Sequence, residues 1–309
     1  YTPEEIISRL ELKPVTQYQS EIISSPLEPS VVIAGAGSGK TETMSNRVLY
    51  LVANGFVTPD QILGLTFTRK AAGELSVRIR KRLRQLAAHK DFKHIVSTST
   101  SVTTYHSYAG KLLSEHAIRY GIDADAEPLG EAAIWQIASD VVRNWSDDSY
   151  RNQSAVSTVI KDLLGLSKLM LEHQVKAEDI ERIGNEVLSA LAPLQGASNG
   201  EVRDVAKAMR QRNSLLPMVE TFMQRRKAAG EFSFDDQMSL AADIAQNFED
   251  VGVLERGKYK VVLLDEYQDT SQSQVRMLSS LYGGGHPVMA VGDPSQAIYT
   301  WRGASAGTM

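Results

Sequence analysis

Short apolar runs separated by longer mixed stretches mark two parts of the chain, residues 15–110 and the part that begins near residue 232. Such runs, when they are rich in β-branched residues and bounded by glycine or polar residues, are typical of buried parallel strands. They occupy residues 31–34, 62–67, 102–105, 261–264 and 288–291. Residues 40–53 and 71–88 follow two of these runs and are expected to be helices. The pattern therefore predicts an α/β fold with a parallel sheet.

The part between these two regions has a different pattern. Apolar residues recur there at i, i+3, i+4 and i+7, which places them on one face of a helix. Four stretches follow this rule, namely 134–145, 156–164, 183–191 and 202–209, and residues 195–200 form the clearest loop. We therefore expect an all-helical domain at residues 113–229, inserted into one α/β domain formed by residues 1–112 and 230–309.

The composition excludes several classes of protein. The chain has 309 residues, 42% of them hydrophobic, which is enough for a large core and about two domains. It has no cysteine, so disulfides and thiolate metal sites are excluded. The apolar runs are far shorter than the ~20 residues of a membrane span, and the acidic first residues do not match a secretion signal. We expect a soluble cytoplasmic protein that does not interact with a membrane.

Charge is unevenly distributed along the chain. The net charge of −4 alone argues mildly against a nucleic-acid partner. Residues 69–93, however, contain nine Lys or Arg against two acids, Glu74 and Asp91. A solvated helix face explains many such runs, but this one belongs to the same α/β region as the nucleotide site described next, which favours a basic path for nucleic acid.

The segment AGAGSGKT at residues 34–41 lies between a predicted strand and a predicted helix, the setting of a phosphate-binding loop. Its glycines let the backbone wrap closely around phosphates, and amides at the start of the helix point at the anion. Lys40 is expected to reach the β- and γ-phosphates of a nucleotide, and the Thr41 hydroxyl to hold Mg²⁺. Ala34 stands where the strict pattern has glycine. The expected backbone contacts come from Ala36, Gly37, Ser38 and Gly39.

The run VVLLDE at residues 261–266 ends a predicted strand with two acids. Successive strand residues face opposite ways, so the two acids can have different tasks. Asp265 is expected to bind Mg²⁺, and Glu266 to polarise the attacking water. Solvated strand-end carboxylates are the alternative, but the phosphate-binding loop upstream favours an NTPase. Lys40 and Asp265 lie 225 residues apart, which supports the inserted domain.

Four further stretches narrow the class of NTPase. They are LTFTRKAA at residues 65–72, TYHS at 104–107, YQDT at 267–270 and VGDPSQAIYTWRGA at 291–304. In order and wording, these motifs resemble those of the UvrD/Rep/PcrA family of superfamily 1 DNA helicases. Thr16 and Gln19 are similar to that family's Q motif, and residues 41–55 with 65–70 look most like actinobacterial AdnB-type helicase–nuclease subunits. The stretch at 291–304 argues against a small-molecule kinase or a GTPase.

The resemblance implies a fold and a nucleotide site. The fold is a RecA-like domain, called 1A in the family, with the helical insert as subdomain 1B. Gln19 would read the adenine edge, Gln268 and Gln296 would sit near the γ-phosphate, and Arg302 would couple the nucleotide state to DNA.

The resemblance also implies a site for single-stranded DNA. Aromatic side chains at strand ends would stack on bases, and polar ones would contact the sugar–phosphate backbone. The stacking residues would be Phe67, Tyr299 and Trp301, and the backbone contacts Thr68, Arg69 and His106. Packing in the core is the alternative for the three aromatics, and a structural histidine is the alternative for His106. Arg225, Arg226 and Lys227 favour a helix-end cluster over a duplex contact.

The sequence departs from the family in three places. Glu42 follows Thr41, where UvrD-type proteins commonly have an arginine that stacks on adenine, so base recognition is expected to differ. Pro294 and Ser295 replace a common acidic pair, which we expect to be tolerated. Nothing resembles motifs IV to VI, which lie on a second RecA-like domain and supply arginines worth ~10³–10⁵ in rate. The chain is therefore interpreted as part of a longer protein and is expected to be nearly inactive alone.

The resulting hypothesis is the ATP- and single-stranded-DNA-binding portion of a DNA helicase that acts at single-strand to duplex junctions in repair or recombination. One alternative is the motor subunit of a recombination helicase–nuclease, with a nuclease domain and partner subunit beyond this chain. The other is an ATP-switched DNA-binding or assembly subunit without turnover.

Overall fold

The computed structural model of the chain describes residues 1–92, 99–123, 125–146, 155–194 and 200–297. The chain divides into two compact units. One comprises Tyr1–Leu112 with Ala241–Met309, and the other comprises Leu113–Leu240. Each unit has its own apolar core.

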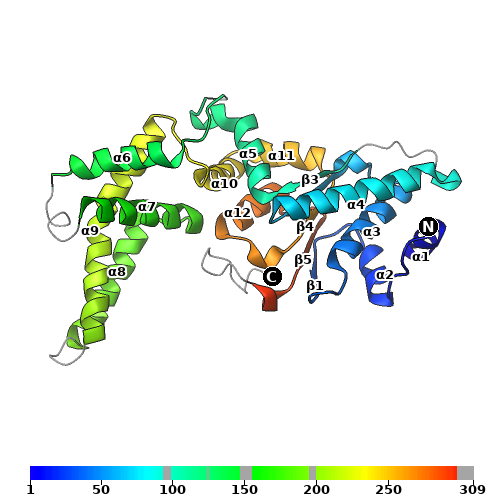
Figure 1. The fold of residues 1–309 in the computed structure, drawn as a ribbon, viewed down its shortest axis with the longest axis horizontal. Helices are drawn as coiled ribbons and strands as arrows, with labels where there is room; N and C mark the ends of the chain where they lie inside the picture. The colour runs from blue at the N-terminus through cyan, green and yellow to red at the C-terminus, as the bar shows by residue number, and fades with distance from the viewer. Residues whose placement is uncertain (93–98, 124, 147–154, 195–199, 298–309) are drawn as a thin grey trace. The chain divides into compact units, whose positions relative to one another are not determined.

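The first unit is built on a sheet of five parallel strands (Figure 1). The strands are β1 (Ser30–Ile33), β2 (Ile62–Thr66), β3 (Ser101–Thr104), β4 (Val261–Leu264) and β5 (Val288–Gly292), in the order β1-β5-β4-β2-β3. Because all five strands run in the same direction, their carboxyl ends meet at one edge of the sheet, where ligands of open α/β sheets bind.

Helices cover both faces of this sheet. Figure 1 shows α3 (Lys40–Ala53) and α4 (Arg69–Ala88) on one side, and α11 (Glu249–Lys258) and α12 (Gln272–Tyr282) on the other. Helices α1 (Pro3–Arg9) and α2 (Gln17–Ile23) also belong to this unit, whereas α5 (Tyr105–His116) and α10 (Asp236–Asn247) run across the two boundaries between the units. Short 3₁₀ turns occupy Pro59–Gln61, Lys90–Phe92, Ala117–Tyr120, Ala192–Leu194, Tyr267–Asp269 and Pro294–Gln296.

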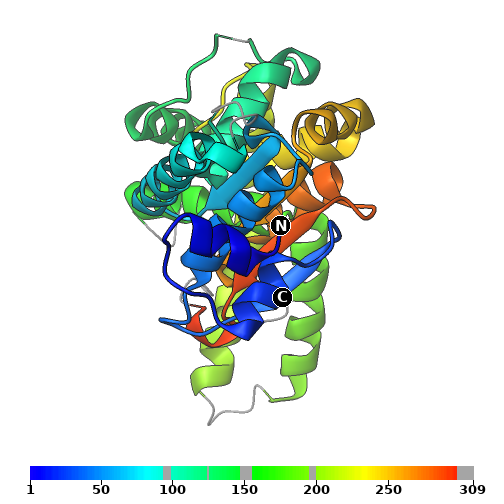
Figure 2. The same cartoon turned by 90° about the vertical axis from the view of Figure 1, so that its right-hand side faces the viewer.

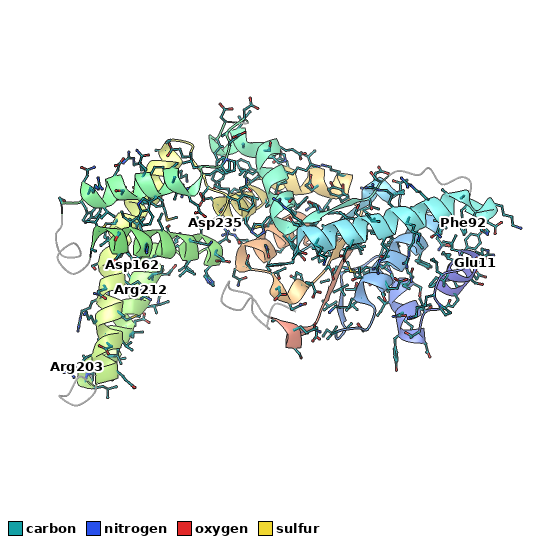
Figure 3. All side chains as sticks on the ribbon, in the orientation of Figure 1. Glu11, Phe92, Asp162, Arg203, Arg212 and Asp235 are labelled. Atoms are coloured by element: carbon teal, nitrogen blue, oxygen red, sulfur yellow. The ribbon has the colours of Figure 1, made fainter. Side chains whose placement is uncertain are left out.

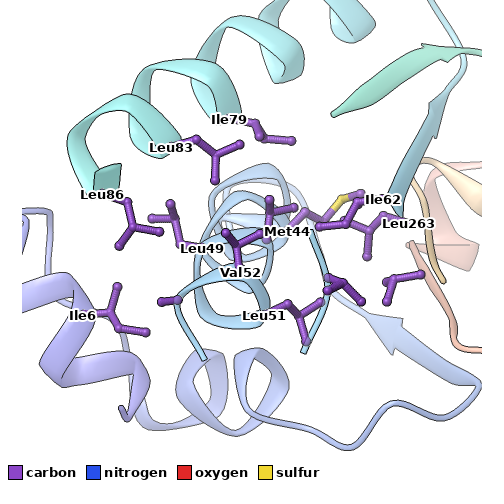
Figure 4. Close-up of a cluster of buried hydrophobic side chains, with 14 of the residues drawn as sticks. Ile6, Met44, Leu49, Leu51, Val52, Ile62, Ile79, Leu83, Leu86 and Leu263 are labelled. Atoms are coloured by element: carbon purple, nitrogen blue, oxygen red, sulfur yellow. The ribbon is translucent and has the colours of Figure 1, made fainter. Parts of the chain in front are cut away.

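Helical periodicity explains how α4 packs against α3. Leu75, Ile79, Leu83 and Leu86 recur every three or four residues, so they form one apolar stripe, and all four are buried. Figure 4 shows Ile79, Leu83 and Leu86 of this stripe facing Met44, Leu49 and Val52 of α3, and Ile62 and Leu263 of the sheet and Ile6 of α1 belong to the same cluster. This core fixes the two helices whose first residues are the candidate nucleotide and DNA contacts.

The second unit contains α6 (Glu131–Arg143), α7 (Val156–His173), α8 (Ala177–Leu191) and α9 (Gly200–Ala228). The two helices α6 and α7 and the C-terminal half of α9 enclose an apolar core that includes Val142, Leu163 and Phe222. Figures 1 and 2 both show α8 and the N-terminal half of α9 extending beyond α6 and α7.

Polar contacts join α8 to α9 in this extension. Arg212, labelled on α9 in Figure 3, donates from Nη2 to the Ile180 carbonyl at 3.2 Å. The side-chain amide of Asn213 donates from Nδ2 to Asn185 Oδ1 at 3.2 Å. Gly184 is buried against these side chains: a Cβ there would lie 2.5 Å from Asn213 Oδ1. A glycine therefore lets the two helices approach where few apolar residues hold them.

The predicted fold class, a parallel α/β domain with a helical insert, is confirmed. Helix 40–53 and strand 261–264 agree with the prediction at both ends, and the other predicted elements are present with shifted ends. One predicted property is wrong: the strand at residues 31–34 is not buried. As β1 lies at an edge of the sheet, Val31 and Ile33 are 55% and 68% exposed.

Residue 200, predicted as the end of a loop, begins α9, and residues 195–199 lie outside the described part of the chain. Among the described residues, every helix is too short or too polar to cross a membrane.

Candidate active site at the carboxyl edge of the sheet

The loop between β1 and α3 forms a backbone cradle. Gly37 and Gly39 have φ of +75° and +88°, a left-handed conformation that glycine adopts without steric cost. Gly39 is the N-cap of α3 and makes no side-chain cap, so no side chain of its own covers the first turn. Ala36 and Ser38 belong to the same turn, which the Ser38 hydroxyl closes by donating to the Gly35 carbonyl at 2.7 Å. This geometry fits a phosphate group held by main-chain amides.

Gln19 supports this loop from α2. Its Oε1 accepts from the Thr16 amide at 3.0 Å, and its Nε2 donates to the Ser38 carbonyl at 3.0 Å. A Cβ on Gly39 would lie 2.9 Å from the same Nε2. One more donor and one more acceptor site of the amide group remain for a base. The adenine contact of Gln19 stays a prediction, and the structure adds a second task, the support of the phosphate loop.

Lys40, Asp265 and Glu266 come together where β1 and β4 end. Lys40 Nζ lies 3.9 Å from Glu266 Oε2, with the lysine side chain only 10% exposed. The Glu266 amide donates to Asp265 Oδ1 at 3.1 Å. Since the Lys40–Glu266 pair is long and half open to solvent, it adds little stability. Turning the amine towards a phosphate oxygen therefore costs little.

The electrostatics of Asp265 differ from those of a surface acid. Its side chain is 6% exposed. Burial, followed by the charge of Glu266, raises the pKa of Asp265 from 3.8 to about 6, and the Glu266 amide and Lys40 oppose this rise. The Tyr105 hydroxyl donates to the Asp265 carbonyl at 3.1 Å, and burial raises the pKa of that phenol. A buried carboxylate with a raised pKa gains most from a cation placed beside it.

Glu266 has a strained backbone. Its φ is +50°, in the left-handed region that costs a non-glycine residue ~1–2 kcal/mol. Strain of this kind persists where surrounding contacts fix the residue, and it clusters at active sites. Here the Glu266 backbone is held at both ends: its amide donates to Asp265 Oδ1 at 3.1 Å, and its carbonyl accepts from the Asp269 amide at 3.0 Å. Gln268 orients the side chain, because its Nε2 donates to Glu266 Oε2 at 2.8 Å.

Gln268 also joins β4 to β5. It is 2% exposed, and its Oε1 accepts from the Asp293 amide at 3.0 Å. Asp293 in turn accepts hydrogen bonds from the Gln296 side chain and, at 3.0 Å, from the Ser295 amide. The bond from Gln296 is the main cause that lowers the pKa of Asp293. Glu266, Gln268, Asp293 and Gln296 thus form one continuous hydrogen-bonded chain across two strand ends.

Mg²⁺ is the metal that this chemistry implies. It favours oxygen ligands and is bound through one or two protein groups together with substrate phosphates. The Thr41 hydroxyl, in the first turn of α3, and the Asp265 carboxylate are donors of that kind. Among the described residues, no group of three or more His, Cys, Asp or Glu could hold a metal ion without such phosphates. The assignment of Mg²⁺ to Thr41 and Asp265 stays a prediction.

The candidate DNA residues follow β2 and β3 at the same edge. Thr66 pairs in register with Thr104, so the residues after them leave neighbouring strands at the same level. Thr68 and Arg69 are exposed, whereas Phe67 and His106 are half-buried. The Thr68 hydroxyl caps α4 by accepting from the Ala71 amide at 3.1 Å.

Three predicted site residues lie outside the described part of the chain. They are Tyr299, Trp301 and Arg302. Their assignments, like those of the other site residues, stay predictions.

Sequence reasoning missed roles for Asp293 and Tyr105. Asp293 lies in the motif VGDPSQ, and its Oδ2 is 3.8 Å from the position of a Cβ on Gly35. The motif was a usable signal for Asp293. Tyr105 is fully buried, and nothing in its spacing indicates that it contacts a residue 160 positions away.

Known proteins resemble nearly the whole chain. Residues 15–309 match the family described as UvrD/REP helicase N-terminal domain. The chain is 30% identical over 284 residues to "ATP-dependent DNA helicase UvrD1" of Mycobacterium tuberculosis, covering 90% of this chain and 32% of that protein. It is 26% identical to "ATP-dependent DNA helicase PcrA" of Staphylococcus epidermidis, covering 95% and 35%. For "DNA helicase II" of Haemophilus influenzae the identity is 28%, covering 93% and 34%.

The part of each relative that the chain covers limits how finely the chain can be assigned. The chain spans about a third of their length. The finer likeness to AdnB-type subunits stays a prediction. With the parallel sheet, the phosphate cradle and the paired acids in place, the family match gives the conclusion that this chain belongs to the UvrD/REP helicase family and corresponds to its N-terminal domain.

Proposed function

We propose that the chain is the ATP- and single-stranded-DNA-binding portion of a motor that translocates on DNA and opens duplexes at single-strand to duplex junctions. The observation that carries this proposal is the hydrogen-bonded chain from Glu266 through Gln268 to Asp293 and Gln296. It places the candidate catalytic acid and the candidate phosphate sensors in one network. A site of this kind can respond to the presence of a single phosphoryl group.

Each residue has a chemical task in this proposal. Main-chain amides of the loop at residues 36–39 would hold the phosphates of ATP, and Lys40 would neutralise their charge. Mg²⁺, held by Thr41 and Asp265, would supply further charge neutralisation at the phosphates. Glu266 would orient and deprotonate the attacking water.

The strand order supports a division of the edge into two parts. Nucleotide residues follow β1, β5 and β4, and the candidate DNA residues in the described part of the chain, Phe67, Thr68, Arg69 and His106, follow β2 and β3. With strands ~4.8 Å apart, the ends of β1 and β2 are separated by about 14 Å. ATP and a DNA strand can therefore occupy the same edge side by side, as a motor that couples hydrolysis to movement requires.

ATP hydrolysis by the full-length gene product, with and without single-stranded DNA, tests the proposal. We expect DNA to stimulate hydrolysis, and Lys40→Ala to reduce the stimulated rate at least about a hundredfold. Arg203→Ala, on the exposed part of α9, is a matched control for loss of one positive charge and should leave the rate unchanged. ATP binding without DNA-stimulated turnover would contradict the motor and favour an ATP-switched DNA-binding subunit.

Direction and pathway belong to the same proposal. Family resemblance favours 3′→5′ movement and a role in repair or recombination, and a partner nuclease is the alternative setting. We expect the 309-residue chain alone to bind ATP weakly and turn it over slowly, because the family's transition-state arginines lie on a second RecA-like domain. Brisk DNA-stimulated turnover by this chain alone would contradict that expectation.

A further inference from the structure

A charged cluster lies within the otherwise apolar interface of α3 and α4. Glu42, in the first turn of α3, accepts hydrogen bonds from two arginines of α4. Its Oε1 pairs with Arg82 and its Oε2 with Arg78 at 3.2 Å. Arg82 also donates from Nη1 to Asn46 Oδ1 at 2.6 Å. One guanidinium group therefore bridges two successive turns of the helix that starts at the phosphate loop.

This cluster is a poor source of stability. Arg82 and Asn46 are 8% and 2% exposed, and Asn46 Nδ2 is buried without a hydrogen-bond partner. Burial of charged and polar groups costs about as much as their pairing returns, so apolar residues would serve the interface equally well. What ion pairs and bridging hydrogen bonds add is a defined orientation. The cluster fixes one register of α4 against α3.

The two helices that it joins begin at different ligands. Glu42 directly follows Lys40 and Thr41, the proposed phosphate and Mg²⁺ contacts. Helix α4 begins at Arg69, directly after Thr68, and both are proposed DNA contacts. Arg82 lies thirteen residues along α4, about 20 Å from its start at 1.5 Å per residue. A displacement of the first turn of α3 would therefore be passed to α4, whose first residues are the proposed DNA contacts.

We infer that Glu42 is a positioning residue that couples the phosphate loop to the DNA-binding end of α4 through Arg82. The inference rests on the proposed function. The Glu42 side chain is turned towards α4 and contacts both arginines there. Coupling of this kind requires that both partners of the bridge act as one unit.

A simpler role makes different predictions. If Arg78 and Arg82 only neutralised an acid that would otherwise repel the triphosphate, removal of Arg82 would weaken ATP binding, and removal of Glu42 would not. If the bridge transmits, Glu42→Gln and Arg82→Gln have the same effect, and that effect is on DNA stimulation and not on the KM for ATP.

Steady-state ATP hydrolysis by the full-length gene product, with and without single-stranded DNA, separates the two roles. The variants are Glu42→Gln, Arg82→Gln, the double variant, and the charge swap Glu42→Arg with Arg82→Glu. Glu74→Gln is the matched control, because it removes one acid from the exposed face of α4, outside the cluster. Thermal unfolding of each variant shows that it is folded.

We expect both single variants to lose stimulation roughly threefold to tenfold, with the KM for ATP within about twofold of the parent. The double variant should lose no more than either single one. The charge swap should recover part of the loss, since the unpaired Asn46 Nδ2 can donate to a glutamate at residue 82. The control should match the parent.

Three outcomes would overturn the coupling. The losses of the two single variants could multiply in the double variant, Arg82→Gln alone could raise the KM for ATP, or stimulation could be unchanged in all variants. A parent protein without any stimulation would instead overturn the proposed function, and the coupling with it.

Discussion

Replacement of Asp265 by asparagine should stabilise the protein and stop its chemistry. The pKa of Asp265 rises from 3.8 to about 6 on folding, chiefly because the carboxyl group is buried. A carboxyl group with a raised pKa opposes folding when it is ionised. This destabilisation is complete above about pH 6, shrinks as the pH falls towards 4, and is absent below that.

The magnitude follows from the two pKa values. At 1.36 kcal/mol for each pKa unit, their difference corresponds to about 3 kcal/mol as an upper bound. Asparagine keeps an oxygen that can accept the hydrogen bond from the Glu266 main-chain amide, so the substitution loses little of the stability that this bond contributes. For a unit of this size, each kcal/mol raises the melting temperature by about 2–4 °C. We expect Asp265→Asn to melt roughly 3–10 °C higher at pH 8.

Thermal unfolding at pH 8 and pH 4.5, followed by circular dichroism, measures the effect. The gain should be present at pH 8 and mostly absent at pH 4.5. Asp293→Asn is the control: it makes the same charge change at the next strand end, where the pKa is lowered, so it should not stabilise at pH 8. A pH-independent gain, or no gain, would refute the burial argument. DNA-stimulated hydrolysis should be lost in Asp265→Asn in either case.

Four further substitutions test the backbone and the core. Gly39→Ala should lower the free energy of unfolding by about 1–2 kcal/mol and weaken ATP binding, because φ is +88° there. Gly73→Ala, on the open face of α4, should instead raise the free energy of unfolding by up to about 1 kcal/mol. Melting temperature and ATP titration check both. Arg47→Met should cost about 2–4 kcal/mol by urea unfolding, since the buried guanidinium donates to four main-chain carbonyls after and within α2. Gly283→Ala should lower the melting temperature, because its Cβ would lie 2.4 Å from the Ser279 carbonyl oxygen and the backbone must shift.

The fold could be predicted from the sequence wherever local pattern and tertiary context agree. Residues 261–264 are a central strand that is followed by two acids, and the phosphate loop fixes the start of helix 40–53. Predicted ends were wrong by one or two residues where a threonine caps the next helix. Thr104 accepts from the Ser107 amide, so Tyr105 begins α5, and Thr68 caps α4, so that helix begins at Arg69.

Features that depend on strand order or distant contacts could not be predicted. A β-branched run gives no sign of whether its strand lies in the middle or at the edge of a sheet, so the exposure of Val31 and Ile33 was missed. The partners of Glu42 lie 36 and 40 residues away, on a helix whose basic residues were all assigned to DNA. The burial of Asp265 and the positive φ of Glu266 likewise depend on the loops that surround them.

Strand order also limits the routes by which ATP can act on DNA. Because β5 and β4 separate β1 from β2, two sets of contacts among the described residues lead from the phosphate loop towards the candidate DNA residues. One route crosses the strand ends through Gln268, which contacts both Glu266 and Asp293. The other passes beneath the edge, from α3 to α4 through Glu42 and Arg82. Under the proposed function, the first route would respond to the γ-phosphate, because it includes the candidate catalytic acid Glu266. The second responds to the position of the first turn of α3, so it can report binding before any bond is broken.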